Sequence, residues 1–335
     1  KYTTHFVDED LLPNNKYAYK VALLMEDGRE SLASDSISVQ TLPNLESVSL
    51  IETISDLPRQ IKVLWRPHQS QRVESYIIQR STPTESKWTK IKTIDGRYNV
   101  EYIDDKLKDN ETFMYRIKVE TFDGIVSNPS AISTATTKAL PGQIEGLQAT
   151  KDLPRKIQLS WAPSKTEDVV QYIIYRATSA DGIFSKHASA PVAHNRFDDM
   201  INEDGKIFFY KITTLDKDAL ESKVSEVNPT MGQTLPKPKM PKVTLAQIQG
   251  NKMILNWKPG DDRTISYNVY KTTKTGWATS QEKVIPNIDA LRFEDPDVVR
   301  GVEYTYSLQA VDKNGLVSSK TEGISAKLPK IEEEK

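Results

Sequence analysis

Histidine side chains are the first candidates for chemistry in this chain of 335 residues. Only four occur, at His5, His68, His187 and His194, and the chain has no cysteine. His187 and His194 lie close in sequence, as two zinc ligands could, but no cysteine or clear third ligand accompanies them. The pattern favours surface histidines over a zinc site.

Acidic clusters are the second candidates, because carboxylates are the ligands that calcium prefers. None of the clusters has the Asp-x-Asp-x-Asp-Gly spacing of a calcium loop, and most stand where a strand begins or a turn forms. We therefore expect solvated turn residues. The sequence predicts no metal and no other cofactor. The clusters are Asp104-Asp105, Asp198-Asp199, Asp261-Asp262 and the segment EDPD at 294–297.

Motifs of known enzyme classes are absent from the sequence. It contains no P-loop, no G-x-G-x-x-G, no G-x-S-x-G and no H-E-x-x-H. Asp-Gly-Arg occurs at 27–29 and 95–97, the reverse of the Arg-Gly-Asp order, and glycine after aspartate is typical of a tight turn. We expect no enzyme within these residues.

The charge balance excludes another class of function. Lysine and arginine number 45 against 46 acidic residues, so the net charge is -1 and no field attracts nucleic acid. No apolar run is long enough to span a membrane. With 37% hydrophobic and 27% charged residues, the composition is that of a folded chain.

A repeat of 96 residues organises the chain. "LPRQIKVLWRP" at 57–67 recurs as "LPRKIQLSWAP" at 153–163, with a weaker copy at 250–259, and the three contain Trp65, Trp161 and Trp257. Apolar residues alternate with polar ones in these segments, which is typical of half-buried strands. The sequence therefore predicts an all-β chain built of antiparallel sheets.

Two motifs connect the repeats to a known family. Each of these three tryptophans begins a Trp-x-Pro motif, and a Tyr-x-Tyr-like pair recurs in "KYAYKV" (16–21), "TFMYRI" (112–117), "IFFYKI" (207–212) and "EYTYSL" (303–308). The units resemble fibronectin type III domains, which are β-sandwiches of about 100 residues. The resemblance implies tandem sandwiches like beads on a string. It also implies a corner hydrogen bond from the first tyrosine of the pair, absent where Phe113 and Phe208 replace it.

Leu-Pro pairs mark the predicted domain boundaries. Residues 1–41 contain only the later strand motifs, so we expect the C-terminal half of a truncated domain with one apolar face uncovered. The alternative is that its strands find a partner sheet in another molecule. The predicted domains are 42–139, 140–234 and 235–329, followed by a charged tail at 330–335.

The loop after the first Trp-x-Pro motif differs from its copies. It reads HQSQRV where the other repeats contain acidic residues, so Arg66, His68 and Arg72 are peculiar to this copy and the repeat gives them no structural role. Loops at the end of a rigid sandwich often carry binding residues. We interpret this loop as a candidate surface for a partner.

The segment "WRPHQSQRV" is similar to the fibronectin-binding segment of bacterial fibronectin-like protein A adhesins, which are surface lipoproteins. The resemblance implies an exported, surface-anchored adhesin that binds host fibronectin, with a lipid anchor outside this sequence. It departs from the family at Gln69-Ser70-Gln71, where the family carries proline, an acid and an aromatic residue. The residues that the resemblance assigns to fibronectin are Trp65, Arg66, Pro67, His68, Arg72 and Val73.

A second interpretation needs no ligand. Fibronectin type III domains often separate other modules, so the chain is alternatively a non-catalytic spacer or scaffold of a larger exported protein.

Overall fold

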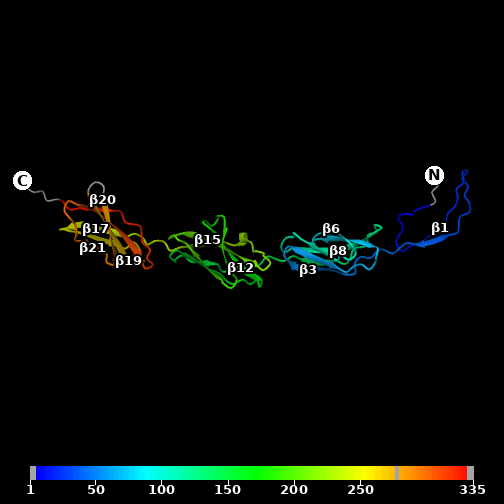
Figure 1. Cartoon of the computed structure of the whole chain (residues 1–335), viewed down its shortest axis with the longest axis horizontal. Coiled ribbons are helices and arrows are strands. Elements are labelled where there is room, and N and C mark those ends of the chain that lie inside the picture. Colours follow the sequence, from blue (N-terminus) through cyan, green and yellow to red (C-terminus); the bar gives the residue numbers. More distant parts are fainter. Residues whose placement is uncertain (1–4, 276–278, 330–335) are drawn as a thin grey trace, which may run out of the picture. The chain divides into compact units, whose positions relative to one another are not determined.

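The computed structural model describes residues 5–275 and 279–329 (Figure 1). Its regular elements are antiparallel strands, apart from one turn of 3-10 helix at Val224–Glu226. No helix among the described residues is long and apolar enough to cross a bilayer. The chain divides into two compact units, Lys1–Leu140 and Pro141–Lys335. The predicted tail at 330–335 lies outside the described residues.

Each repeat forms a three-stranded and a four-stranded sheet with the same strand order, and we call the three copies the first, second and third sandwich. The first contains sheets β3(Ile51–Leu57)-β4(Gln60–Trp65)-β7(Glu101–Asp104) and β6(Thr89–Asp95)-β5(Val73–Ser81)-β8(Thr112–Thr121)-β9(Ser133–Thr136). The second contains β10(Gln148–Ala149)-β11(Lys156–Ser160)-β14(Arg196–Met200) and β13(Ser185–Pro191)-β12(Val169–Ala177)-β15(Ile207–Asp216)-β16(Thr230–Gln233). The third contains β17(Lys242–Gln249)-β18(Lys252–Lys258)-β21(Arg292–Asp295) and β20(Thr279–Ile288)-β19(Thr264–Thr275)-β22(Glu303–Asp312)-β23(Ile324–Lys327). This arrangement confirms the predicted all-β class of fibronectin type III sandwiches.

The alternation of apolar residues places the core. Ile61, Val63 and Trp65 are buried on one face of β4, while Lys62 and Leu64 between them are only half-buried. Each of the three repeat tryptophans packs edge-on against a tyrosine of the facing sheet. In the first sandwich the ring centroids of Trp65 and Tyr76 lie 5.3 Å apart, and the other two copies repeat the contact at 5.2 Å. The sequence repeat therefore reflects the same tryptophan–tyrosine packing in the core of each sandwich.

The corner hydrogen bond occurs where the sequence predicts it. The Tyr304 hydroxyl accepts a bond of 3.1 Å from the Val299 amide, and the Tyr17 hydroxyl accepts one of 2.8 Å from the Leu12 amide. Phenylalanine replaces this tyrosine in the first and second sandwiches. There an arginine side chain covers the ring, as Arg80 covers Phe113 at 4.7 Å.

Both Asp-Gly-Arg segments are turns, as predicted. Gly28 and Gly96 have φ angles of 81° and 89°, which L side chains rarely adopt. The Gly28 amide closes its turn on the Met25 carbonyl at 3.0 Å.

Residues 5–41 form a single two-stranded sheet of β1(Lys16–Tyr19) and β2(Ile37–Gln40). Several of its apolar side chains face solvent, including Leu32 at 97% and Phe6 at 81% exposure. The boundaries given above for the four segments of the chain stay a prediction.

Replacing Trp161 by alanine should destabilise the second sandwich by about 3–5 kcal/mol, because a large buried ring is lost and a cavity remains. Hydrogen exchange of peptides from residues 148–233 measures this opening free energy directly. Met200→Ala is the matched control, since this side chain is 74% exposed in the same sandwich. Equal effects of the two substitutions would contradict the proposed core.

Candidate functional site

The predicted binding loop, residues 66–73, runs from the end of β4 to the first residue of β5, and one buried hydroxyl holds it. The Tyr76 hydroxyl accepts a hydrogen bond from the His68 amide at 2.9 Å and donates one to the Arg97 carbonyl at 2.8 Å. The Arg97 guanidinium in turn donates to the His68 carbonyl at 3.0 Å. The loop backbone is therefore fixed from both sides.

His68 has a structural role that the sequence comparison missed. Its Nδ1 accepts from the Ser70 amide at 3.1 Å, so its Nε2 carries the proton and donates to the Glu46 carbonyl at 3.1 Å. Ser164 does the same in the second sandwich, where its hydroxyl accepts from the Thr166 amide at 3.1 Å. The expectation that the repeat gives His68 no structural role is thus wrong, because the ring replaces a turn-forming serine.

Two of the six residues assigned to a partner belong to the core. Trp65 and Val73 are 5% and 1% exposed, so neither side chain is available on the folded surface. Assigning them to a binding surface was an error, since they flank the loop inside buried strands. Arg66 and Pro67 are exposed as predicted.

The two loop arginines differ in their partners. Arg72 pairs with Asp123 at 2.5 Å, and hydrogen bonds from Thr121 and Arg72 hold the pKa of Asp123 below its usual value. Both partners are about half-exposed, so the pair contributes little to stability. Arg66 forms no ion pair with any residue that the structure describes. Arg66 is therefore the most available charge of the loop.

Three of the acidic residues considered for calcium are buried instead. Asp104, Asp199 and Asp295 are between 3% and 5% exposed, which corrects the prediction that they are solvated. Each lies in the three-stranded sheet and accepts one bond from a tyrosine and one from a cation of the four-stranded sheet. We call this arrangement the carboxylate bridge. The bridges are Asp104 with Tyr115 and Arg80, Asp199 with Tyr210 and Arg176, and Asp295 with Tyr306 and Lys271.

The distances in the bridges are those of strong, charge-assisted hydrogen bonds. The tyrosine hydroxyl lies 2.6 to 2.7 Å from the carboxylate, and the cation lies 2.6 to 2.9 Å from it. Burial and the neighbouring carboxylate both raise the pKa of the tyrosine, so the hydroxyl keeps its proton and donates. Burial alone would raise the pKa of Asp295, but bonds from Lys271 and Tyr306 outweigh it and the pKa is lowered.

The two histidines of the sequence pair have different surroundings in the structure. His187 lies on β13 and shares the bridge of the second sandwich, with its Nε2 3.1 Å from Asp199. His194 lies in the following turn, where its amide bonds to the Pro191 carbonyl. Neither belongs to a group of three close ligand atoms within the described ranges.

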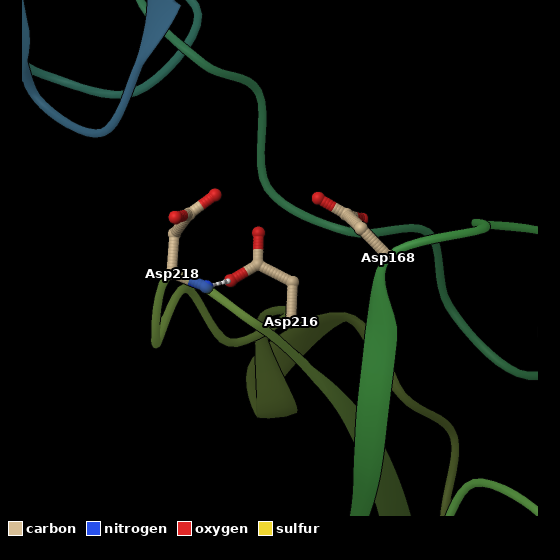
Figure 2. Close-up of side chains that lie close together, drawn as sticks. All are labelled: Asp168, Asp216 and Asp218. Carbon is tan, nitrogen blue, oxygen red and sulfur yellow. Dashed lines mark hydrogen bonds between the residues drawn. The ribbon is translucent and has the colours of Figure 1, made fainter.

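A cluster of three acids appears at one end of the second sandwich, where the sequence predicted no site. One carboxylate oxygen from each of Asp168, Asp216 and Asp218 lies within 4.8 Å of the others (Figure 2). Asp216 is buried and accepts from the amides of Asp218 and Leu220 at 2.9 and 2.8 Å. A group of acids is not by itself a binding site, and we assign no ligand to it.

Aligning the copies explains how this cluster arises. On adjacent strands, Val73 is paired with Thr121 in the first sandwich, Val169 with Asp216 in the second and Thr264 with Asp312 in the third. These three pairs occupy equivalent positions. The residue before each strand is Arg72 in the first copy and Arg263 in the third, and each pairs with an aspartate, so the prediction that Arg72 is peculiar to the first copy is wrong. The second copy has Asp168 there instead. Comparing charges between the repeats was the signal that could have found the cluster.

The sequence matches to known proteins are confined to segments of this chain. No family model matches the chain. It is 34% identical over 84 residues to an amylopullulanase of Thermoanaerobacterium saccharolyticum and 33% identical over 96 residues to one of Thermoanaerobacter thermohydrosulfuricus. These matches cover 25% and 28% of this chain and 6% of each amylopullulanase.

An exo beta-1,2-glucooligosaccharide sophorohydrolase of Parabacteroides distasonis is 32% identical over 122 residues, which cover 35% of this chain and 15% of that protein. The crystal structure of the FN1–FN3 domains of chicken CNTN1 aligns with 84% of this chain and 97% of its own, at 13% identity and a TM-score of 0.27. The fold assignment therefore rests on the strand order described above. The sequence relatives bear the names of enzymes, and they do not support the resemblance to adhesins.

Replacing Tyr115 by phenylalanine should destabilise the first sandwich by about 1–3 kcal/mol, because Asp104 loses one of its two bonds while staying buried. Tyr102→Phe is the matched control on β7 of the same sandwich and should cost less than about 0.5 kcal/mol. Hydrogen exchange of peptides from 51–136 compares the two. An unchanged opening free energy in Tyr115→Phe would show that the bridge does not stabilise the fold.

Acid should weaken the third sandwich through Asp312. Burial raises the pKa of this carboxyl, but bonds from the amides of Leu316 and Asn314 and from Arg263 outweigh it, so the folded pKa is depressed. The stability that the group adds is complete above the unfolded pKa of about 4 and is lost as the pH falls through the folded pKa. Asp312→Asn should be less stable at pH 7 and should lose less stability between pH 6 and pH 3. Hydrogen exchange of residues 242–327 at both pH values measures this, and identical losses in the two proteins would refute it.

Proposed function

We propose that this chain is a non-catalytic spacer or scaffold within a larger carbohydrate-acting polypeptide. The observation that carries the proposal is the carboxylate bridge. In all three sandwiches, the acid, the cation and the tyrosine of the bridge are bound to one another inside the fold. Because these bonds recur at equivalent positions in every sandwich, they favour a structural role for the acids over a catalytic one.

The sequence relatives support the same proposal. Each match is confined to a segment that makes up 6% to 15% of a protein that carries an enzyme's name, and the described residues of this chain form sandwiches of the same strand order. These observations support the proposal that the chain separates other modules. Export, a surface location and a lipid anchor stay predictions from the adhesin resemblance.

The whole chain should neither hydrolyse nor retain polysaccharide, if it only separates other modules. Purified residues 1–335 are incubated with pullulan, amylose and linear β-1,2-glucan, and reducing ends are measured. Affinity electrophoresis in gels containing each glycan measures retention against serum albumin. Release of reducing ends would overturn the non-catalytic assignment, and specific retardation would make the chain a carbohydrate-binding module.

Fibronectin binding is the competing function, and the structure supplies a sharper variant for testing it. Arg66→Ala with Arg72→Ala removes both exposed charges of the loop but keeps His68, whose ring holds the turn. We expect no binding of either the native chain or this variant to immobilised fibronectin. Binding by the native chain that the equally stable variant loses would establish the adhesin function.

A further inference from the structure

The second and third sandwiches are joined by residues 235–241, which we call the junction, and both sandwiches belong to one compact unit, Pro141–Lys335. The junction reads LPKPKMP, so three of its seven residues are prolines. Proline fixes the φ angle, which makes such a segment semi-rigid and extended. Pro238 and Pro241 are also buried. The junction therefore differs from a flexible linker in both composition and burial.

The second sandwich holds the start of the junction. The Leu235 amide donates to the Leu153 carbonyl at 2.8 Å, and the Leu235 carbonyl accepts from the Gly205 amide at 3.2 Å. A side chain on Gly205 would begin 3.3 Å from Pro236, so this proline packs directly on the glycine. The junction therefore begins as a bonded part of the second sandwich.

The third sandwich holds the next residue of the junction. Arg263, the residue before β19, donates from one guanidinium nitrogen to the Pro236 carbonyl at 2.9 Å and to the Asp312 carboxylate at 2.8 Å. Asp312 is 1% exposed, so its buried charge needs this partner. Leu235 and Pro236 are neighbours in the chain, and they are bonded to different sandwiches.

The middle of the junction is fixed to the loop after β18. The Lys239 amide donates to the Asp261 carboxylate at 2.8 Å. Burial would raise the pKa of Asp261, but bonds from the Lys239 amide and the Thr264 hydroxyl outweigh it, so the pKa is lowered and the acceptor is charged. A side chain on Gly260 would begin 2.5 Å from the Lys239 carbonyl oxygen. The two backbones therefore lie in direct contact.

The other sandwiches use the same loop in a similar way. In the second, the Thr166 hydroxyl accepts from the Gly142 amide at 3.0 Å, and in the first, Nε2 of His68 lies 3.1 Å from the Glu46 carbonyl. The loop after each tryptophan strand thus holds the segment that leads into its own sandwich. In the third sandwich, the segment held in this way is also bonded to the sandwich before it.

We propose that the junction is a fixed joint, in which Arg263 holds the third sandwich to the second so that the two move as one body. Domains connected by a linker move relative to one another by default. Here the linker is bonded from both sides within two consecutive residues, which removes that freedom. The proposal concerns movement alone and does not depend on the spacer function.

The test measures one distance across the junction in the whole chain. Because the chain has no cysteine, spin labels attach only to two introduced ones, Met200→Cys in the second sandwich and Glu322→Cys in the third. Both positions are exposed. Double electron–electron resonance then gives the distribution of distances between the labels. A chain in which glycine and serine replace residues 236–241 shows the width that a flexible joint would have.

We expect the native distribution to be about half as wide as that of the glycine–serine chain, or narrower, because the native linker is bonded from both sides. Arg263→Ala should widen the distribution towards that of the glycine–serine chain. Lys237→Ala is the matched control and should leave the width unchanged, since Lys237 is an exposed cation of the junction itself.

Gly260→Ala is a second variant, because Arg263→Ala also removes the partner of the buried Asp312. Hydrogen exchange of residues 303–312 shows whether the third sandwich stays folded in each variant. If Arg263→Ala unfolds it, Gly260→Ala decides, and its distribution should shift or widen as the added methyl group displaces the junction. A native distribution as wide as that of the glycine–serine chain, or unchanged distributions in the folded variants, would overturn the proposal. The glycan assays do not depend on this distance, so the joint and the spacer function fail separately.

Discussion

A buried carboxylate that is shared between two sheets is the constraint on which each sandwich depends. Burying a charge is costly unless a counter-charge and hydrogen bonds surround it. Asp199 meets this requirement only when Tyr210 and Arg176, on two other strands, stand in one register. A slip of one residue would turn these side chains to the other face and leave the charge alone. The bridge therefore selects one register among many that the apolar pattern would allow.

This constraint also distinguishes the residues that hold the fold together from those on the loops, which are free to vary. The three strand positions of the carboxylate bridge are the same in every copy, whereas the loops between strands differ. Arg72 and Asp168 occupy one position in two copies and carry opposite charges. Any recognition by the described part of the chain is therefore expected at such loop ends.

The sequence predicted what local periodicity controls. Alternation along β4 and β8 gave the strands and their buried faces, and the repeat of tryptophan gave the core. Prediction from the sequence failed where two groups that are far apart in the chain meet in the fold. Asp104 was predicted to be a solvated turn residue because its partner, Arg80, lies 24 positions earlier. The prediction that His68 has no structural role was wrong for another reason. Its ring does what a serine does in the next copy, and residue type alone does not show such a replacement.

The most direct test of the central claim is a double-mutant cycle across the bridge of the second sandwich. Asp199→Asn, Tyr210→Phe and the double variant are compared in the whole chain by hydrogen exchange of residues 148–233. The account predicts a coupling energy of about 1 kcal/mol or more between the two positions, because each group is buried against the other. Additive effects would contradict it, since the carboxylate and the hydroxyl would then stabilise the fold independently.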